Sequence, residues 1–329
     1  MRALILDDIQ KIRITDNAIP ECDDTEILLN VSHCSVCRTD AKMWFQGQRD
    51  LVLPRIPGHE ISGYTPDSGE RYIVWPAKVC HHCYYCKNGM ENLCENIHII
   101  GFHRDGGFAE YVKVPKTSLI PIPSTMPAEI ACMTELLASG INAIEQAGVQ
   151  KGHNVLIFGG GPAGLLLGMA CKHFGAYPFI VENNPLKLRL TMPFCEAADM
   201  GISANANSER YDSVINAAPD PKTFIDGIGV LRAGGTYCLY SGFIKDETVQ
   251  ASVLVNLLNE VHYRQLTVIG AYGCAKRHME TALNIMEQHV KTVTLLVPKI
   301  ISLTQVPSVL PEILSGHALK YVVDMQKRE

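Results

Sequence analysis

Four closely spaced cysteines constrain this chain more than any other feature. Their spacing, C-x2-C-x2-C-x7-C, can wrap four thiolates around one tetrahedral metal ion, and they are Cys80, Cys83, Cys86 and Cys94. A closed shell of four thiolates leaves no coordination position for a substrate, so such a site stabilises a lobe and does not react. The sequence therefore predicts a structural zinc site and places the chemistry elsewhere in the chain.

Two other interpretations of this cysteine run remain open. A bacterial iron–sulfur run has its fourth cysteine after three residues and proline next, whereas here seven residues intervene and Glu95 follows. Four unrelated thiols in a loop are the other alternative, which the two regular two-residue gaps argue against. Apart from Cys37, the remaining cysteines lack metal spacing and are predicted to be small core or surface residues: Cys22, Cys34, Cys132, Cys171, Cys195, Cys238 and Cys274.

Length and composition describe an ordinary globular chain. With 329 residues it can form two domains, since single cores stop growing at about 250 to 300 residues. A net charge of -5 with dispersed Lys and Arg predicts neither a nucleic-acid nor a membrane partner. The first apolar run is short and is broken by Asp7 and Asp8, so we expect no secretory signal and a cytoplasmic location.

The hydrophobic pattern changes twice along the chain. Up to about residue 123, short β-type runs separated by Gly, Pro and Asp predict a mostly β domain. From about residue 129 apolar residues follow helical spacing, and strands then alternate with helices, which predicts a parallel doubly wound sheet. We therefore predict an α/β chain with a catalytic domain at 1–135 that includes a zinc lobe at 80–94, a Rossmann domain at 136–273, and a return to the catalytic domain at 274–329.

A glycine motif predicts dinucleotide binding. Gly159, Gly161 and Gly164 form G-x-G-x-x-G directly after the apolar run VLIF and directly before a helical pattern. The glycines allow a tight turn, close approach of the pyrophosphate and packing of helix on strand, and the helix N-terminus faces the phosphates. Glu182 ends the next strand, 18 residues beyond Gly164, where a carboxylate accepts hydrogen bonds from the ribose of NAD and repels the extra phosphate of NADP. A polar strand end is the alternative interpretation of Glu182.

Three more residues are candidate metal ligands: Cys37, His59 and Glu135. They lie in the sequence segments CSVCRTD, PGHE and TELLA. Together with the four-cysteine loop and the glycine motif, these segments resemble the zinc-dependent medium-chain dehydrogenase/reductase family, which comprises the alcohol and polyol dehydrogenases. The resemblance extends over essentially the whole chain. The resemblance implies a GroES-like catalytic domain with a Rossmann coenzyme domain, two zinc ions and NAD. It also implies a homodimer or homotetramer assembled through the coenzyme domain.

The resemblance further implies roles for single residues. Cys37, His59 and Glu135 match the ligands of a catalytic zinc whose open position admits substrate oxygen. Glu60 resembles a residue that lies beside this metal and can exchange into its coordination. Asp40 resembles the acid that orients the ligand histidine.

Helix residues after Cys37 match further positions of the family. Arg38 matches a position that can reach the cofactor pyrophosphate, with an ordinary surface charge as the alternative, and Thr39 matches the hydroxyl that accepts the alcohol proton. Many relatives finish this proton relay with a histidine, whereas this chain has Lys42, whose ammonium is a poor base unless burial lowers its pKa. His103 and Arg104 either face the active site or line the loop surface.

The resemblance implies reversible oxidation of a secondary alcohol to a ketone, with zinc as Lewis acid and NAD as hydride acceptor. Glutamate at the third ligand position is similar to the polyol and threonine dehydrogenase branch, and a hard carboxylate ligand suits a polyhydroxylated substrate. We therefore predict a small-molecule substrate that is a polyol, sugar alcohol or aminocyclitol. The alternatives are a threonine-type amino-alcohol dehydrogenase, an aldehyde reductase, and a non-catalytic NAD-binding zinc protein.

Overall fold

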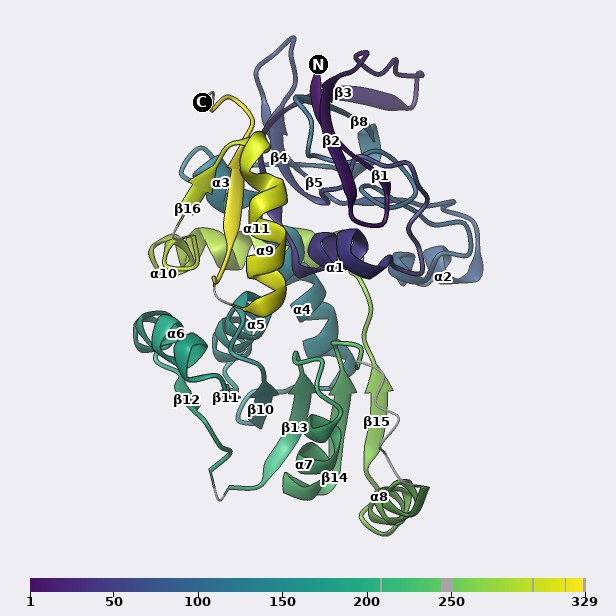
Figure 1. The fold of residues 1–329 in the computed structure, drawn as a ribbon. Coiled ribbons are helices and arrows are strands. Elements are labelled where there is room, and N and C mark those ends of the chain that lie inside the picture. Colours follow the sequence, from purple (N-terminus) through teal and green to yellow (C-terminus); the bar gives the residue numbers. More distant parts are fainter. Residues whose placement is uncertain (208, 244–250, 298, 317, 328–329) are drawn as a thin grey trace. The chain divides into compact units, whose positions relative to one another are not determined.

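The computed structural model describes residues 1–207, 209–243, 251–297, 299–316 and 318–327 (Figure 1). The chain forms two compact units, one from Met1–Ala138 with Cys274–Glu329 and the other from Ser139–Gly273. The mixed α/β class predicted from the sequence is confirmed. The predicted domain limits stay a proposal, because compactness alone does not show that a unit folds by itself.

The first unit is built on a mixed sheet to which both ends of the chain contribute. Its path is β16-β17-β3-β4-β5-β9, with β8 also paired to β3. The C-terminal strand β17 pairs antiparallel with β3, so that Tyr321 lies opposite Val36. Two smaller sheets pair β1 with β2 and β6 with β7. The strands are β1 (Arg2–Asp8), β2 (Lys11–Asp16), β3 (Glu26–Val36), β4 (Glu60–Tyr64), β5 (Arg71–Val74), β6 (Ala77–Lys78), β7 (His98–Ile99), β8 (Tyr111–Pro115), β9 (Leu119–Pro121), β16 (Lys299–Ile301) and β17 (Tyr321–Asp324).

Short helices accompany this sheet, and apolar residues from its strands form the core. Leu29, Val31 and Ile61 of the strands, and Phe108 of the segment before β8, are at most 1% exposed and belong to one hydrophobic cluster. The helices of this unit are α1 (Arg38–Gln46), α2 (Tyr84–Lys87), α3 (Ala128–Ala131), α9 (Lys276–Gln288), α10 (Val290–Thr294) and α11 (Val306–Ser315), with single turns η1 (Glu91–Leu93), η2 (Lys116–Ser118) and η3 (Leu303–Gln305). Helix α4 (Thr134–Gln146) contains the boundary between the two units.

The second unit is the predicted doubly wound sheet. Six parallel strands follow the order β12-β11-β10-β13-β14-β15, so the chain leaves β10 first toward one edge and then toward the other. The apolar run of β10 is buried on both faces, as a central parallel strand requires. The strands are β10 (Asn154–Phe158), β11 (Tyr177–Val181), β12 (Gly201–Ser203), β13 (Tyr211–Asn216), β14 (Leu231–Leu239) and β15 (Thr267–Gly270), and the helices are α5 (Pro162–His173), α6 (Pro185–Ala197), α7 (Lys222–Val230) and α8 (Ala251–Tyr263). Within the described residues, no helix has the length and hydrophobicity needed to cross a bilayer.

A buried carboxylate anchors the start of β3. The side chain of Glu26 is 5% exposed and pairs with Arg104, while the ammonium groups of Lys78 and Lys113 lie 3.7 and 3.6 Å from its oxygens. Burial alone would raise the pKa of Glu26, but the hydrogen bond and charge of Arg104 and the charge of Lys113 outweigh burial and lower it. The ring of His103 accepts a hydrogen bond from the backbone of Ile99. These contacts give both His103 and Arg104 structural roles in their loop.

We predict that Glu26→Gln destabilises the protein near neutral pH and not in acid. The folded pKa of Glu26 lies below the unfolded value of about 4.3, so its contribution is present above that pH and is lost as pH falls below it. We expect the free energy of unfolding in urea to fall by about 2 kcal/mol at pH 7. The difference from the wild type should shrink steadily between pH 5 and pH 3.

The exposed carboxylate variant Glu21→Gln serves as the control and should change stability little at either pH. A loss in Glu26→Gln that is equally large at acid and neutral pH would contradict an ionic role for Glu26.

Candidate functional site

Cys37 stands where β3 ends and α1 begins, and the local sequence holds it there. It is the N-cap of α1, its Sγ accepts a hydrogen bond from the backbone of Thr39 at 3.4 Å, and its own N–H donates to Asp40 Oδ2 at 2.8 Å. This reciprocal cap satisfies two of the free N–H groups at the start of the helix. A thiol and a carboxylate are therefore fixed side by side at the end of a buried strand.

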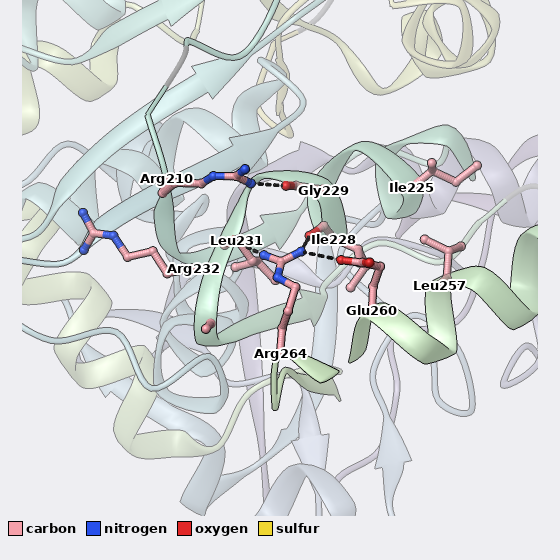
Figure 2. Close-up of a pocket in the computed structure, with 10 residues that line it drawn as sticks. Arg210, Ile225, Ile228, Gly229, Leu231, Arg232, Leu257, Glu260 and Arg264 are labelled. Carbon is pink, nitrogen blue, oxygen red and sulfur yellow. Dashed lines mark hydrogen bonds and ion pairs between the residues drawn. The ribbon is translucent and has the colours of Figure 1, made fainter. Parts of the chain in front are cut away.

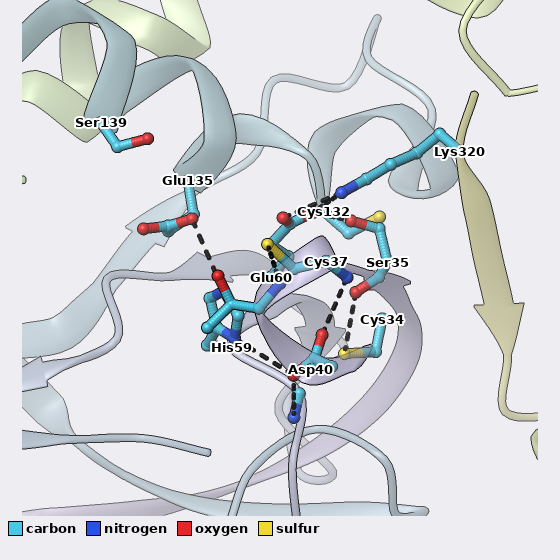
Figure 3. Close-up of polar contacts among 12 residues, drawn as sticks. Cys34, Ser35, Cys37, Asp40, His59, Glu60, Cys132, Glu135, Ser139 and Lys320 are labelled. Carbon is cyan, nitrogen blue, oxygen red and sulfur yellow. Dashed lines mark hydrogen bonds and ion pairs between the residues drawn. The ribbon is translucent and has the colours of Figure 1, made fainter. Parts of the chain in front are cut away.

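Sheet pairing brings two further polar side chains to Cys37. Ser35 on β3 lies opposite Glu60 on β4, and His59 directly precedes Glu60. The ligand atoms of Cys37, His59 and Glu60 all lie within 4.8 Å of one another, and all three residues are buried (Figure 3). Thiolate, imidazole and carboxylate are donors that suit zinc, so the group fits this ion.

Glu135, at the start of α4, lies at the edge of this group. Its Oε2 is 4.0 Å from His59 Nε2, and its side chain is 13% exposed. Burial raises the pKa of Glu135 to about 7, a rise that His59 opposes and Glu60 reinforces. In the structure, therefore, Glu60 and not Glu135 is the carboxylate that groups with Cys37 and His59. The third-ligand role of Glu135 and the exchanging role of Glu60 stay predictions.

Asp40 lies behind the imidazole of His59. Its Oδ1 is 3.4 Å from His59 Nδ1, and both side chains are at most 6% exposed. Burial alone would lower the pKa of His59, but the nearby carboxylate of Asp40 and the sulfur of Cys37 raise it well above the usual value. Nδ1 of His59 has no hydrogen-bond partner among the described residues, and Asp40 is the carboxylate that lies beside it. The orienting role of Asp40 stays a prediction.

Lys320 is a site residue that sequence reasoning missed. It directly precedes β17, and its ammonium lies 2.9 and 2.7 Å from the two carboxylate oxygens of Glu60, with both side chains at most 4% exposed. Ser35 also donates a hydrogen bond to Glu60. Burial alone would lower the pKa of Lys320, but Glu60 raises it above the usual value. The one sequence signal was a lysine next to an apolar strand, and its partner is 260 residues away.

The four cysteines of the zinc lobe meet as their spacing predicts. The sulfur atoms of Cys80, Cys83, Cys86 and Cys94 all lie within 4.8 Å of one another. Backbone N–H groups of the turns point at the sulfurs, since Cys80 N lies 3.3 Å from Cys94 Sγ and Cys83 N 3.3 Å from Cys80 Sγ. Backbone hydrogen bonds lower the pKa of Cys80 and of Cys83, whereas burial raises the pKa of Cys86 to about 12 and also raises that of Cys94. The convergence of the four sulfurs within one loop fits a zinc ion.

The glycine loop follows β10 and leads into α5. Gly159 has a φ of +106°, which favours glycine, and Gly161 is the N-cap of α5. A Cβ atom on Gly164 would lie 1.9 Å from the carbonyl oxygen of Gly159, whereas one on Gly161 would meet nothing within 4 Å. The loop thus needs glycine at 164 for packing and leaves open space beside Gly161. That space fits close approach of a dinucleotide pyrophosphate.

Glu182 is held next to this loop at the end of β11. Its Oε2 accepts a hydrogen bond from Gly160 N at 3.0 Å, its Oε1 accepts one from Asn184 N at 2.9 Å, and it is 6% exposed. These two bonds fix the carboxylate at the point where the strand order of the sheet reverses. In dinucleotide-binding sheets with this glycine motif, the acid that binds the ribose lies at this point.

Among the residues that the structure describes, two cations on α1 have no acid within ion-pair distance. Nε of Arg38 is buried and has no hydrogen-bond partner among the residues that the structure describes. Burial lowers the pKa of Arg38, and burial followed by the charge of Arg38 lowers the pKa of Lys42. The two residues are four apart on one helix and repel one another. An anionic group would relieve this repulsion, which fits a cofactor phosphate. Thr39, between them, is half-buried.

This chain is similar to alcohol and sugar dehydrogenases in both sequence and fold. The family model described as Alcohol dehydrogenase GroES-like domain matches residues 23–124. L-galactonate-5-dehydrogenase of Escherichia coli is 29% identical over 82% of this chain and 83% of that protein, and L-threonine 3-dehydrogenase of Bacillus subtilis is 29% identical over 79% of each. The crystal structure of galactitol-1-phosphate dehydrogenase from Escherichia coli has a TM-score of 0.85 at 22% identity and covers 98% of this chain and 100% of that one. The predicted GroES-like and Rossmann architecture is thereby confirmed.

We predict that Lys320→Met destabilises the protein because it leaves the carboxylate of Glu60 buried without a counter-charge. The free energy of unfolding in urea should fall by about 3 to 5 kcal/mol. The double variant Lys320→Met with Glu60→Gln removes both charges and should recover part of this loss. The exposed lysine variant Lys291→Met is the matched control. Equal losses in Lys320→Met and in the double variant would show that charge pairing is not the cause.

We predict that two alanine substitutions in the glycine loop have different effects. Gly164→Ala forces a Cβ against backbone and should lower the free energy of unfolding by about 1 to 3 kcal/mol. Gly161→Ala should change stability by less than about 0.5 kcal/mol. Its Kd for NADH, from fluorescence titration, should rise at least about tenfold because the Cβ enters the space left for the pyrophosphate. If Gly161→Ala binds NADH as tightly as the wild type, the space beside Gly161 is not the pyrophosphate site.

Proposed function

The chain belongs to the zinc-dependent medium-chain dehydrogenase/reductase family, and we propose that it transfers a hydride between NAD and a secondary alcohol or ketone. The observation that carries the proposal is the buried group of Cys37, His59 and Glu60, with Glu135 at its edge. A four-cysteine lobe and a dinucleotide loop accompany it in the same chain. This combination of sites serves oxidation of an alcohol better than any other chemistry that the sequence suggested.

The chain offers places for two zinc ions. We assign the structural ion to Cys80, Cys83, Cys86 and Cys94, and the catalytic ion to Cys37 and His59 with a carboxylate from Glu135 or Glu60. When bound, the catalytic zinc supplies Lewis-acid stabilisation of negative charge on the substrate oxygen, and NAD supplies the hydride chemistry.

The protein groups around that position have separate tasks. We assign to Asp40 the orientation of the His59 ring, and Lys320 and Ser35 hold the carboxylate of Glu60 in one orientation. We assign to Thr39 Oγ1 the acceptance of the proton from the substrate hydroxyl. Holding these groups in place before substrate arrives lowers the cost of ordering them during reaction.

We assign cofactor binding to the glycine loop with Glu182 and Arg38. Gly159, Gly161 and Gly164 shape the backbone around the pyrophosphate, and Arg38 supplies a cation without an acid partner among the described residues. The carboxylate of Glu182 would accept hydrogen bonds from the ribose hydroxyls. Because its charge would repel a phosphate on that ribose, NAD is favoured over NADP.

The surroundings of the metal group favour a substrate with several hydroxyl groups. Two carboxylates, Glu60 and Glu135, lie beside His59, and carboxylates accept hydrogen bonds from neighbouring hydroxyls. The similarity to L-galactonate-5-dehydrogenase supports a polyol, sugar alcohol or aminocyclitol. The similarity to L-threonine 3-dehydrogenase supports the amino-alcohol alternative, and a substrate panel separates the two.

We further propose a homodimer or homotetramer in the cytoplasm. β15 is one of the two edge strands of the coenzyme sheet, and its residues Thr267–Gly270 carry no charge. Val268 within it is 41% exposed, and Tyr272 just after it is 46% exposed. An uncharged edge strand readily pairs with a second copy. The twelve cysteines all lie within the described residues and none of them forms a disulfide there, which suits a reducing compartment.

The function is tested by measuring zinc per chain together with NAD and NADP reduction over polyols, cyclitols, amino alcohols and simple alcohols. We expect two zinc ions and turnover of a polyhydroxylated compound with NAD. Cys37→Ser should lose one zinc ion and at least about 100-fold in kcat/KM, because a direct metal ligand matters at least as much as the groups that support it. Cys94→Ser should also lose one zinc ion, with a lower Tm.

Cys22→Ser, at an exposed thiol outside both metal groups, is the control and should keep both ions and full activity. Comparing Glu60→Gln with Glu135→Gln identifies the carboxylate ligand as the one whose loss releases zinc. One zinc ion per wild-type chain and no turnover across the panel would overturn the catalytic assignment and favour a non-catalytic NAD-binding zinc protein.

A further inference from the structure

The coenzyme unit contains a pocket of about 540 Å³ at the edge of its sheet that is remote from the glycine loop. The pocket is lined from the amino ends of the strands, since Arg210 directly precedes β13, while Leu231 opens β14 and is paired with Tyr211 of β13. The glycine loop instead follows the carboxyl end of β10 in the same parallel sheet. Amino and carboxyl ends of parallel strands lie at opposite edges, so this pocket is distinct from the dinucleotide site.

Three arginines line this pocket, and two of them already have acid partners. Arg264 Nη1 lies 3.2 Å from a carboxylate oxygen of Glu260, and Arg232 Nη1 lies 2.7 Å from Asp212 Oδ1. Arg210 donates to the carbonyl of Gly229, and among the described residues no carboxylate lies within ion-pair distance of it. Arg264 and Arg232 are each neutralised by one acid, so the net positive charge of this group lies on Arg210.

The bonds to backbone carbonyls explain only part of this arrangement. Arg264 donates to the carbonyls of Ile228 and Leu231, and Arg210 donates to that of Gly229, so both satisfy free C=O groups around the end of α7. A guanidinium has five N–H donors in a planar fork, and Arg210 uses one nitrogen for this bond. The remaining donors of Arg210, an exposed residue, are available to a ligand.

The pocket has a cationic end and an aliphatic end. Figure 2 shows Arg210 and Arg232 on one side, with the guanidinium of Arg232 directed away from that of Arg210, and Ile225 and Leu257 on the other side. The Arg264–Glu260 pair lies between them. Ile225 is 42% exposed although it lies beside the apolar surface of α8. Within the lining, Glu260 is the one acid, and it is already paired with Arg264. The arrangement is complementary to a molecule with an anionic head and an apolar body.

We propose that this pocket binds an amphipathic organic anion, a carboxylate or phosphate monoester attached to a short aliphatic chain. The head group lies against Arg210, whose planar fork matches the geometry of carboxylate and phosphate oxygens. The chain lies against Ile225 and Leu257. The volume falls within the range of about 300 to 1,000 Å³ that is usual for small-molecule sites. The proposal goes beyond the dehydrogenase function and does not rest on it.

The test is calorimetric titration of the zinc-loaded protein, saturated with NAD so that the cofactor site is filled. The ligands are acetate, hexanoate, octanoate and octyl phosphate, with octanamide as an uncharged analogue. We expect affinity to rise with chain length and octanamide to bind at least about tenfold more weakly than octanoate. Arg210→Gln should weaken octanoate and octyl phosphate at least about tenfold. If Arg210→Gln lowers the affinity for octanoate and octyl phosphate equally, the site recognises the negative charge of the ligand. If it lowers the affinity for one of them alone, that ligand has the head group that the site binds.

Two further variants separate the two ends of the pocket. Ile225→Asn, at a half-exposed position where folding should be unaffected, should remove the gain from acetate to octanoate. Lys222→Gln, an equal charge change on the exposed start of α7 outside the pocket lining, should leave every affinity unchanged. The proposal is overturned if octanoate and octyl phosphate fail to bind at 10 mM, or if they bind the wild type and a normally folded Arg210→Gln equally.

Discussion

The buried contact of Glu60 with Lys320 and Ser35 is the interaction on which the metal group depends. The three residues come from or directly precede three neighbouring strands, in the order β17, β3 and β4. A carboxylate that is 0% exposed is stable as an anion only when it has a counter-charge and hydrogen bonds, and the C-terminal segment supplies that charge. The return of the chain to its first sheet therefore completes the environment of residues near its start.

The remaining site geometry follows from this sheet. β3 ends at Val36, so Cys37 caps α1 at the same edge where β4 begins with Glu60. The cap joins Cys37 to Asp40, and Asp40 in turn lies against His59. One strand pairing and one helix cap thus bring together sulfur, imidazole and carboxylate groups from separate segments. The four-cysteine lobe needs no such convergence, because its turns place all four sulfurs within a single loop.

Local patterns carried most of the prediction. The cysteine spacing, the strand–turn–helix glycine motif and the alternation of strands with helices each act over a short stretch, and each describes the structure well. Glu182 lies beside the glycine loop at the predicted spacing, and hydrogen bonds fix it there. Lys320 could not be found in this way, since its partner is 260 residues away and neither residue belongs to a motif that links them. The relative placing of Glu60 and Glu135 was also beyond the sequence.

By itself the sequence determined the fold class, the zinc lobe and the dinucleotide loop, because spacing and hydrophobic period are local properties of the chain. The tertiary structure decided which carboxylate lies with Cys37 and His59, which cation neutralises it, and that Arg104 serves Glu26. It also brought Arg210, Arg232 and Arg264 to one pocket. Those outcomes depend on strand order and register, which arise from packing between distant segments, and a buried charge accepts only the partner that this packing delivers.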